Sequence, residues 1–199
     1  MKNGRATLTT FGFMLRSDAV SAAAAATVAL AIGSTSIFRA NTNSAALVWM
    51  SAAVGISSIL FAIGATREDR KMRWLLMSAP LYGRELARAI VIAPVLIGCL
   101  AGSVTSIIGM QLVPWYQCVI ATLAAAATGN MISISGTLRI GRDRLVFLAS
   151  GFVAASGIAY IGTLGGPMTT AASVLLAAVG SYFALRAFGE TFARLDLVD

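Results

Sequence analysis

The chain has 199 residues, of which 58% are apolar and only 12% are charged. Roughly a quarter of the residues in a soluble domain are charged, so water is not the main solvent of this protein. The charges lie in short clusters separated by long uncharged stretches. Only helices and closed barrels satisfy their backbone groups in lipid, and no period-2 alternation indicates a barrel. The sequence therefore predicts an all-α polytopic membrane protein.

Six uncharged stretches are long enough for a helix to cross the hydrocarbon core, which is roughly 30 Å thick. They cover residues 19–38, 45–65, 89–110, 117–138, 145–163 and 168–186. The first resembles a secretory signal, but its apolar run is longer than the roughly 7–15 residues of such signals. We expect six transmembrane helices that form a single domain over residues 1–199.

Basic residues are distributed unevenly between the predicted loops. If six spans alternate in direction, every Lys and Arg except Arg39 falls on one side, together with all acidic residues. The positive-inside rule then places the terminal segments 1–17 and 187–199 in the cytoplasm. This topology and attraction to anionic lipid explain the net charge of +7, so no nucleic-acid partner is expected.

The predicted spans are rich in Ala, Gly, Ser and Thr, which let helices approach closely, so a compact bundle is expected. Pro94 in the third span should kink that helix or free a carbonyl group. A short turn or re-entrant kink is expected before the last span. Four helix-breaking residues gather there: Gly162, Gly165, Gly166 and Pro167.

Residues that carry chemistry are scarce. No Asp, Glu, Lys or Arg lies inside a predicted span away from its ends, which disfavours an ion-driven carrier. The chain has no histidine, and Cys99 and Cys118 lack the clustered spacing of a metal or redox site, so no metal site is predicted. It also lacks the phosphate-binding G-x-x-x-x-G-K-[ST] loop. We therefore expect no enzymatic activity in this chain.

The cytoplasmic connection between the second and third spans, residues 66–88, is longer than a helical hairpin needs. Thr66 and Asp69 have the spacing of a capping box, so a helix is expected to begin at Arg67. Its apolar face follows the i, i+3, i+4, i+7 spacing and comprises Met72, Leu75, Leu76 and Ala79. Pro80 ends the helix. Such an element could simply lie on the lipid headgroups.

The segment REDRKMRWLLMSAPLYGREL (67–86) resembles the segment after the second span of ABC type 2 permeases. In that family an acidic residue, a charged turn, a leucine pair, a proline and a basic-acidic pair recur in this order. The family's segment is a coupling helix that sits in a groove of a separate ATP-binding subunit. The residues that the resemblance assigns to this contact are Glu68, Asp69, Arg70, Met72, Leu75, Leu76 and Pro80. The three charged residues would make polar contacts, the three apolar ones would anchor the helix, and the proline would set its exit.

In its small size and short loops the chain is most similar to the haem-exporter permease of cytochrome c maturation. The resemblance implies a permease subunit of an exporter in the prokaryotic cytoplasmic (inner) membrane, with an amphipathic, lipid-like or haem-like substrate. It also implies two partners, an ATP-binding subunit and a second copy or homologous permease. ATP and Mg²⁺ would bind to the ATP-binding subunit, and this chain would hold no cofactor.

Four large side chains are candidates for lining a substrate path: Trp49, Met50, Phe152 and Tyr160. Such residues more often face lipid or neighbouring helices. A function of a different class is also open, that of a non-transporting anchor or scaffold subunit of a larger membrane complex. That subunit would dock another partner through residues 66–88. A passive channel fits less well, because it leaves the long connection unexplained.

Overall fold

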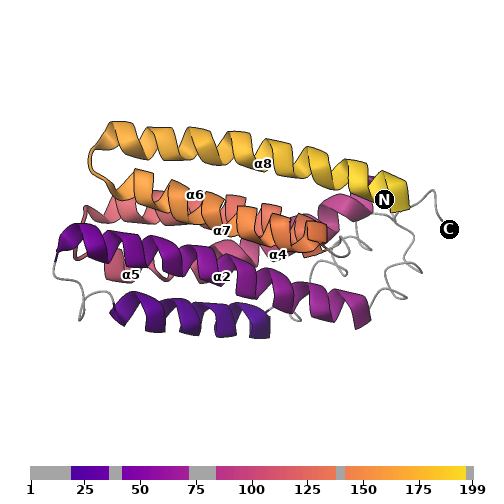
Figure 1. Cartoon of the computed structure of the whole chain (residues 1–199), viewed down its shortest axis with the longest axis horizontal. Helices are drawn as coiled ribbons and strands as arrows, with labels where there is room; N and C mark the ends of the chain where they lie inside the picture. The colour runs from indigo at the N-terminus through magenta and orange to yellow at the C-terminus, as the bar shows by residue number, and fades with distance from the viewer. Residues whose placement is uncertain (1–18, 36–41, 72–83, 138–141, 196–199) are drawn as a thin grey trace, which may run out of the picture.

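The computed structural model describes residues 19–35, 42–71, 84–137 and 142–195, and within these ranges the chain is helical without any β-strand (Figure 1). A first helix covers Ala19–Thr35. The others are α2 (Asn43–Lys71), α4 (Arg84–Ser103), α5 (Ser106–Gly109), α6 (Trp115–Thr137), α7 (Arg142–Thr163) and α8 (Pro167–Leu195). The predicted all-α fold is confirmed for the described residues.

Four of the described helices are long and apolar enough to cross a bilayer. Their apolar parts are Asn43–Gly64 in α2, Trp115–Gly136 in α6, Arg144–Thr163 in α7 and Pro167–Arg186 in α8. These parts coincide with four of the six predicted spans. A shorter apolar helix, Ala19–Thr35, and a shorter apolar helical stretch, Pro94–Gly109, which covers the end of α4 and α5, lie at the predicted first and third spans. The protein is therefore a multi-pass helical membrane protein.

The third predicted span, residues 89–110, is not one continuous helix. α4 ends at Ser103, two turn residues follow, and the short helix α5 begins at Ser106. The Thr105 hydroxyl donates to the Gly102 carbonyl at 2.6 Å, and the Thr105 N–H donates to the same carbonyl at 3.2 Å. This i to i−3 pattern tightens the chain and interrupts the α-helical ladder. The sequence predicts a disturbance of this span at Pro94, but α4 is helical on both sides of Pro94 and the interruption lies at residues 104–105.

The helix predicted to begin at Arg67 does not begin there. α2 runs without a break to Lys71, so Thr66 lies inside a helix and is not its N-cap. An N-cap residue needs a non-helical backbone, and the residues that follow Thr66 are compatible with a helix interior. At the other end of the chain α8 continues to Leu195, so most of the predicted tail from residue 187 is helical.

The turn predicted before the last span is confirmed. Residues 164–166 connect α7 to α8, and the two helices run antiparallel (Figure 1). Gly165 and Gly166 have φ angles of +117° and +97°. Glycine adopts these angles without the steric penalty that a Cβ atom would bring, so the sequence determines where the chain reverses.

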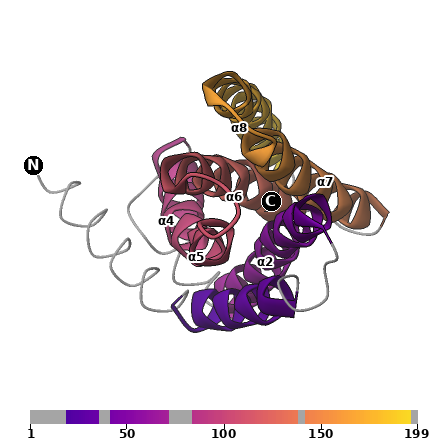
Figure 2. The same cartoon turned by 90° about the vertical axis from the view of Figure 1, so that its left-hand side faces the viewer.

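α6 is the central helix of the bundle and contacts α2, α4, α5, α7 and α8. Viewed along the bundle, α8 and the helix Ala19–Thr35 lie on opposite sides (Figure 2). The contacts depend on small residues. A Cβ atom on Gly129 of α6 would lie 2.7 Å from the Ala155 Cβ of α7. The predicted close approach of helices is therefore confirmed for the described part.

The described charged residues gather at one end of the bundle, which we name the charged end. It comprises residues 67–71 of α2, 84–88 of α4, 142–144 of α7 and 186–194 of α8 (Figure 1). The opposite, uncharged end is formed by residues 42–44, 103–115 and 164–167, none of which is charged. All described Asp, Glu, Lys and Arg residues thus lie on one side of the apolar bundle.

Candidate functional site

The first group of predicted site residues lies at the charged end. Glu68, Asp69 and Arg70 occupy the last turns of α2. The other predicted contact residues, Met72, Leu75, Leu76 and Pro80, lie outside the described residues. The chain enters this stretch from Lys71 and leaves it at Arg84, where α4 begins at the same end of the bundle (Figure 1).

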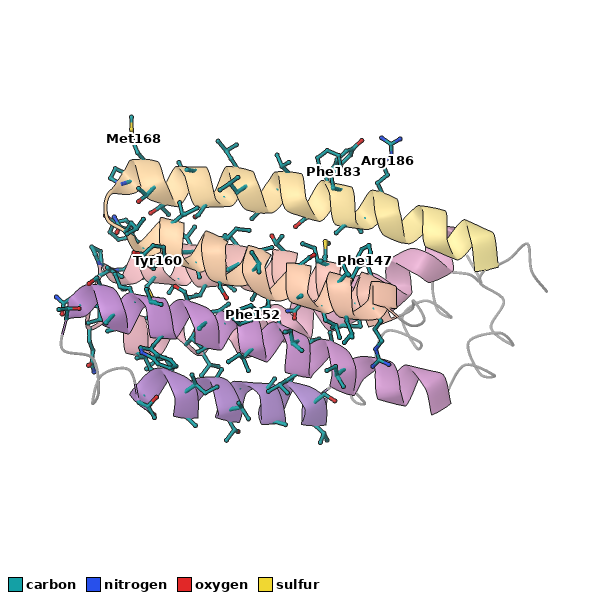
Figure 3. The ribbon with its side chains drawn as sticks, in the orientation of Figure 1. Phe147, Phe152, Tyr160, Met168, Phe183 and Arg186 are labelled. Carbon is teal, nitrogen blue, oxygen red and sulfur yellow. The ribbon has the colours of Figure 1, made fainter. Side chains whose placement is uncertain are left out.

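The four side chains proposed to line a path do not form a single surface. Met50 is fully buried, and Tyr160 packs against the cluster that contains it. Phe152 lies about two helical turns from Tyr160 and packs on Gly55 of α2 (Figure 3). Trp49 is 53% exposed and faces away from the interior. The structure thus brings two of the four together.

Asn130 of α6 is the described residue with the most buried polar atoms that lack a hydrogen bond. It is fully buried, and neither its Nδ2 nor its Oδ1 has a hydrogen-bond partner among the described residues. Gly98 of α4 and Phe61 of α2 enclose the carboxamide, and a Cβ atom on Gly98 would collide with both side chains. Burial of an unpaired amide costs about 1–3 kcal/mol, so such a residue in a membrane bundle is a candidate functional residue.

The sequence reasoning did not single out Asn130, although a signal was present. It is the only Asn or Gln well inside a predicted span, because Gln117 stands at the edge of the fourth. Its neighbours on the chain are mostly small, so the local sequence is also typical of a helix-packing segment. Polar residues inside a membrane are rare, so an isolated carboxamide is a candidate site residue.

Three more buried polar atoms lack a partner in the described part of the chain: Ser133 Oγ, Ser156 Oγ and Gln117 Oε1. They lie at different helix interfaces. Ser133 faces Gly151 of α7, and Ser156 faces Gly55 of α2. The structure therefore does not gather them with Asn130 into one polar pocket. Most other buried hydroxyls donate to a carbonyl of their own helix, as Ser51 does to Leu47 at 2.7 Å.

Metal-ligating side chains are not clustered within the described ranges, where no group of three His, Cys, Asp or Glu residues could hold an ion. Cys99 is half-buried and Cys118 is buried, and both are free thiols. The Cys118 thiol lies 3.5 Å from the Ser106 carbonyl, which links α6 to α5. Cys118 thus has a packing role at a helix interface.

Exposed aromatic residues lie near the uncharged end. Trp115 and Tyr116 in the first turn of α6 are 66% and 44% exposed, and their rings meet edge to face with centroids 6.2 Å apart. Trp49 lies in the second turn of α2, which starts at the same end. Trp and Tyr concentrate at membrane–water interfaces. These positions fit a headgroup region at the uncharged end.

No known protein family, curated protein or solved structure matches this chain. The site is therefore defined by its own geometry. Within the described residues it has an apolar helical bundle, a charged end where α2 ends and α4 begins, and a buried carboxamide, that of Asn130, with both polar atoms unpaired.

Proposed function

We propose that this chain is the membrane-spanning permease subunit of an ATP-binding-cassette exporter, powered by a separate ATP-binding subunit. It has six transmembrane helices, and both termini lie in the cytoplasm of a prokaryotic cell. One observation carries the proposal: every charged residue in the described part of the chain lies at the end where α2 leads into residues 72–83. A soluble subunit that docks on a membrane bundle needs such a polar end.

The orientation follows from the charges. Basic residues at the membrane surface are retained on the cytoplasmic side, so the charged end is the cytoplasmic end. In addition to α8, three described segments place Arg or Lys residues at the charged end, namely 67–71, 84–88 and 142–144. The exposed aromatic residues near the uncharged end then mark the outer interface.

Two shorter helices complete the six passes. The first, Ala19–Thr35, spans about 26 Å, and Ala25 on it packs with Phe61 and Ala62 of α2. The other pass combines α4 with α5, which together run from the charged end to the uncharged end (Figure 1). The break at Thr105 is supported by neighbouring helices, as irregular backbone within a membrane must be.

α2 extends beyond the membrane at the charged end. Its 29 residues span about 43 Å, whereas the hydrocarbon core is about 30 Å thick. Its apolar part ends at Gly64, so Glu68, Asp69 and Arg70 stand outside the lipid. In our proposal these residues contact the ATP-binding subunit. A rigid helix that continues into the bundle can transmit the movement of that subunit to the core.

The substrate path lies between two bundles in this proposal. Within one bundle the helices approach each other closely at glycine residues, which leaves little room for a path between them. A Cβ atom on Gly162, for example, would lie 2.5 Å from the Ala121 Cβ. In contrast, only 33% of the apolar part of α7 and 22% of that of α8 are buried. An uncharged apolar surface of this kind suits an amphipathic, lipid-like or haem-like substrate. The second bundle is another copy or a homologous permease.

A non-transporting anchor or scaffold subunit is the second candidate, and the same close packing favours it. A tightly packed bundle that has no substrate path of its own suits a subunit that only holds its partner at the membrane. Such a subunit would dock another partner through residues 66–88 and would need no ATP. ATP-dependent transport therefore separates the two functions.

The test begins with a search for a neighbouring reading frame that encodes an ATP-binding subunit, and continues with co-purification of the two chains and ATP-dependent transport in proteoliposomes. Glu68→Ala combined with Leu75→Asp should abolish both. Leu164→Asp is the matched control, because it places the same acidic change in an exposed turn at the uncharged end. A stable, active complex carrying both changes would contradict the docking proposal. Complex formation without any ATP-dependent transport would favour the scaffold.

A further inference from the structure

Glycine residues mark the places where the helices of this bundle approach each other. Twelve glycines lie inside helices at positions whose surroundings the structure describes. At eleven of them a Cβ atom would lie less than 3.0 Å from a side chain of another helix. Gly157 of α7 is the exception, because no atom of a neighbouring helix lies within 4 Å of that position. Glycine is less favourable than alanine inside a helix, so Gly157 has a cost that no contact within the described residues offsets.

Gly157 lies on the outward face of α7, which is at the edge of the bundle beside α2 and α8 (Figure 2). Val153, one turn earlier on the same face, is 66% exposed, whereas Ala155 on the opposite face is fully buried. The middle of the outward face carries small or β-branched residues, namely Ala149, Ser150, Val153 and Gly157. Larger exposed side chains lie beyond both ends of this stretch, Leu145 in the first turn of α7 and Leu164 just after the helix. The outward face is therefore recessed at the middle of the membrane.

A lipid chain does not require this shape, whereas a second helix does. Lipid tails are flexible and also cover large side chains, such as Leu175, Leu176 and Val179, which α8 exposes at a similar depth. Two helix backbones approach each other closely only where the side chains between them are small. Crossing helices are closest at the crossing point and separate toward both ends, where larger side chains fill the gap. The outward face of α7 has the shape that such a crossing needs.

We propose that the outward face of α7 contacts the same face of a second copy of this chain, with Gly157 near the crossing point. All copies insert with the charged end on the same side, so the recessed middle of one α7 lies at the same depth as that of the other. A two-fold axis perpendicular to the membrane then brings two identical faces together. No charged residue lies on α7 between Leu145 and Thr163, so like charges do not oppose the contact.

This contact deepens the proposed function, because it identifies the second bundle as an identical copy, and it rests on that proposal for the parallel insertion of all copies. It requires neither an ATP-binding subunit nor transport, so it is tested on this chain alone. If the contact fails, the exporter proposal retains a homologous permease as its second bundle. If transport fails while the contact forms, the chain is a self-associating scaffold.

The first test is disulfide cross-linking of the full chain in native membranes, with Cys99→Ala and Cys118→Ala as the background. Val153→Cys should form a covalent dimer on oxidation with copper phenanthroline. Val179→Cys on α8 is the matched control, because Val179 is 54% exposed and both residues lie about three helical turns from the α7–α8 turn. Equal cross-linking of the two variants overturns the proposal. A Val153→Cys adduct with a different protein overturns the choice of a second copy.

The second test measures energy transfer between donor- and acceptor-labelled copies in proteoliposomes as lipid is added. Gly157→Leu should weaken self-association about tenfold or more, because a bulky side chain overpacks the crossing point. Ala172→Leu is the matched control, since it adds the same bulk to an exposed position of α8 at a similar depth. Both variants should unfold like the unsubstituted chain as detergent-dispersed monomers, where Gly157 has no neighbouring helix. Equal self-association of the two variants overturns the proposal.

Discussion

Thr128 of α6 and Ala177 of α8 are joined by a hydrogen bond of 3.2 Å from the threonine hydroxyl to the alanine carbonyl. The same hydroxyl lies 3.4 Å from the Ser181 hydroxyl, also on α8. α8 is the least buried of the four long apolar helices, and residues such as Met168, Phe183 and Arg186 project from it away from the bundle (Figure 3). Thr128 therefore adds hydrogen-bonding contacts between α6 and α8 to the apolar packing in which Ala177 takes part.

Thr128→Val should weaken the attachment of α8. The substitution preserves shape but removes the hydroxyl, and interhelical hydrogen bonds in membranes contribute about 0.6–1.7 kcal/mol. We expect a loss of that size in the free energy of unfolding, measured by titration with denaturing detergent. Thr122→Val is the control, because its hydroxyl bonds only to carbonyls of α6. Equal losses in the two variants would contradict a specific role for the Thr128 contact.

Gly129→Ala should destabilise the interface between α6 and α7. Its Cβ atom would lie 2.7 Å from the Ala155 Cβ and 3.1 Å from the Ser58 Cβ, and neither Cβ atom can move without its backbone. Overpacking of this kind costs about 1–3 kcal/mol. Thermal unfolding in mild detergent would measure the change.

Gly157→Ala is the matched control for that experiment. No atom of a neighbouring helix lies within 4 Å of a Cβ placed on Gly157, which also sits inside a helix. Alanine there should leave the stability unchanged or raise it by up to about 1 kcal/mol. If Gly129→Ala is as stable as Gly157→Ala, the close approach of α6 and α7 is not a structural requirement.

The positions of the four long apolar helices could be predicted, because long uncharged stretches have few other stable structures in lipid. The end of α2 could not. The spacing of Thr66 and Asp69 fits a capping box, but the same residues are tolerated inside a helix, and no breaking residue follows before Met72. The local sequence is therefore compatible both with the continuation of α2 and with the start of a new helix. In the structure α2 continues to Lys71.

The site was harder to predict than the fold. α6 is apolar or small on all sides, so periodicity gives no sign of which face meets α4. The importance of Asn130 arises only from Gly98 and Phe61, which come from two other helices. Met50 and Trp49 show the same difficulty, since of these two adjacent large side chains Met50 is fully buried and Trp49 is 53% exposed. Long-range packing decides which of these side chains are buried, and the pattern of a single sequence does not reveal that packing.

The proposed orientation predicts which side of the membrane each end faces. In a background without native cysteines, Leu164→Cys in the α7–α8 turn should react in intact cells with a thiol reagent that cannot cross the membrane. Leu164 is 54% exposed at the uncharged end. Arg70→Cys, in the last turn of α2, should react only after permeabilisation. The reverse pattern would show that the bundle is inserted the other way round.

Trp49 and Trp115 should lie at the outer membrane interface, because both are more than half exposed near the uncharged end. The chain has three tryptophans, so Trp74→Phe isolates these two. In proteoliposomes their fluorescence should be quenched more strongly by lipids labelled near the headgroup than by lipids labelled at the chain end. Trp115→Phe, in the same background, reports Trp49 alone and should give the same order. Stronger quenching at the bilayer centre would contradict an interfacial position, since amphipathic indole rings prefer the headgroup level over the hydrocarbon core.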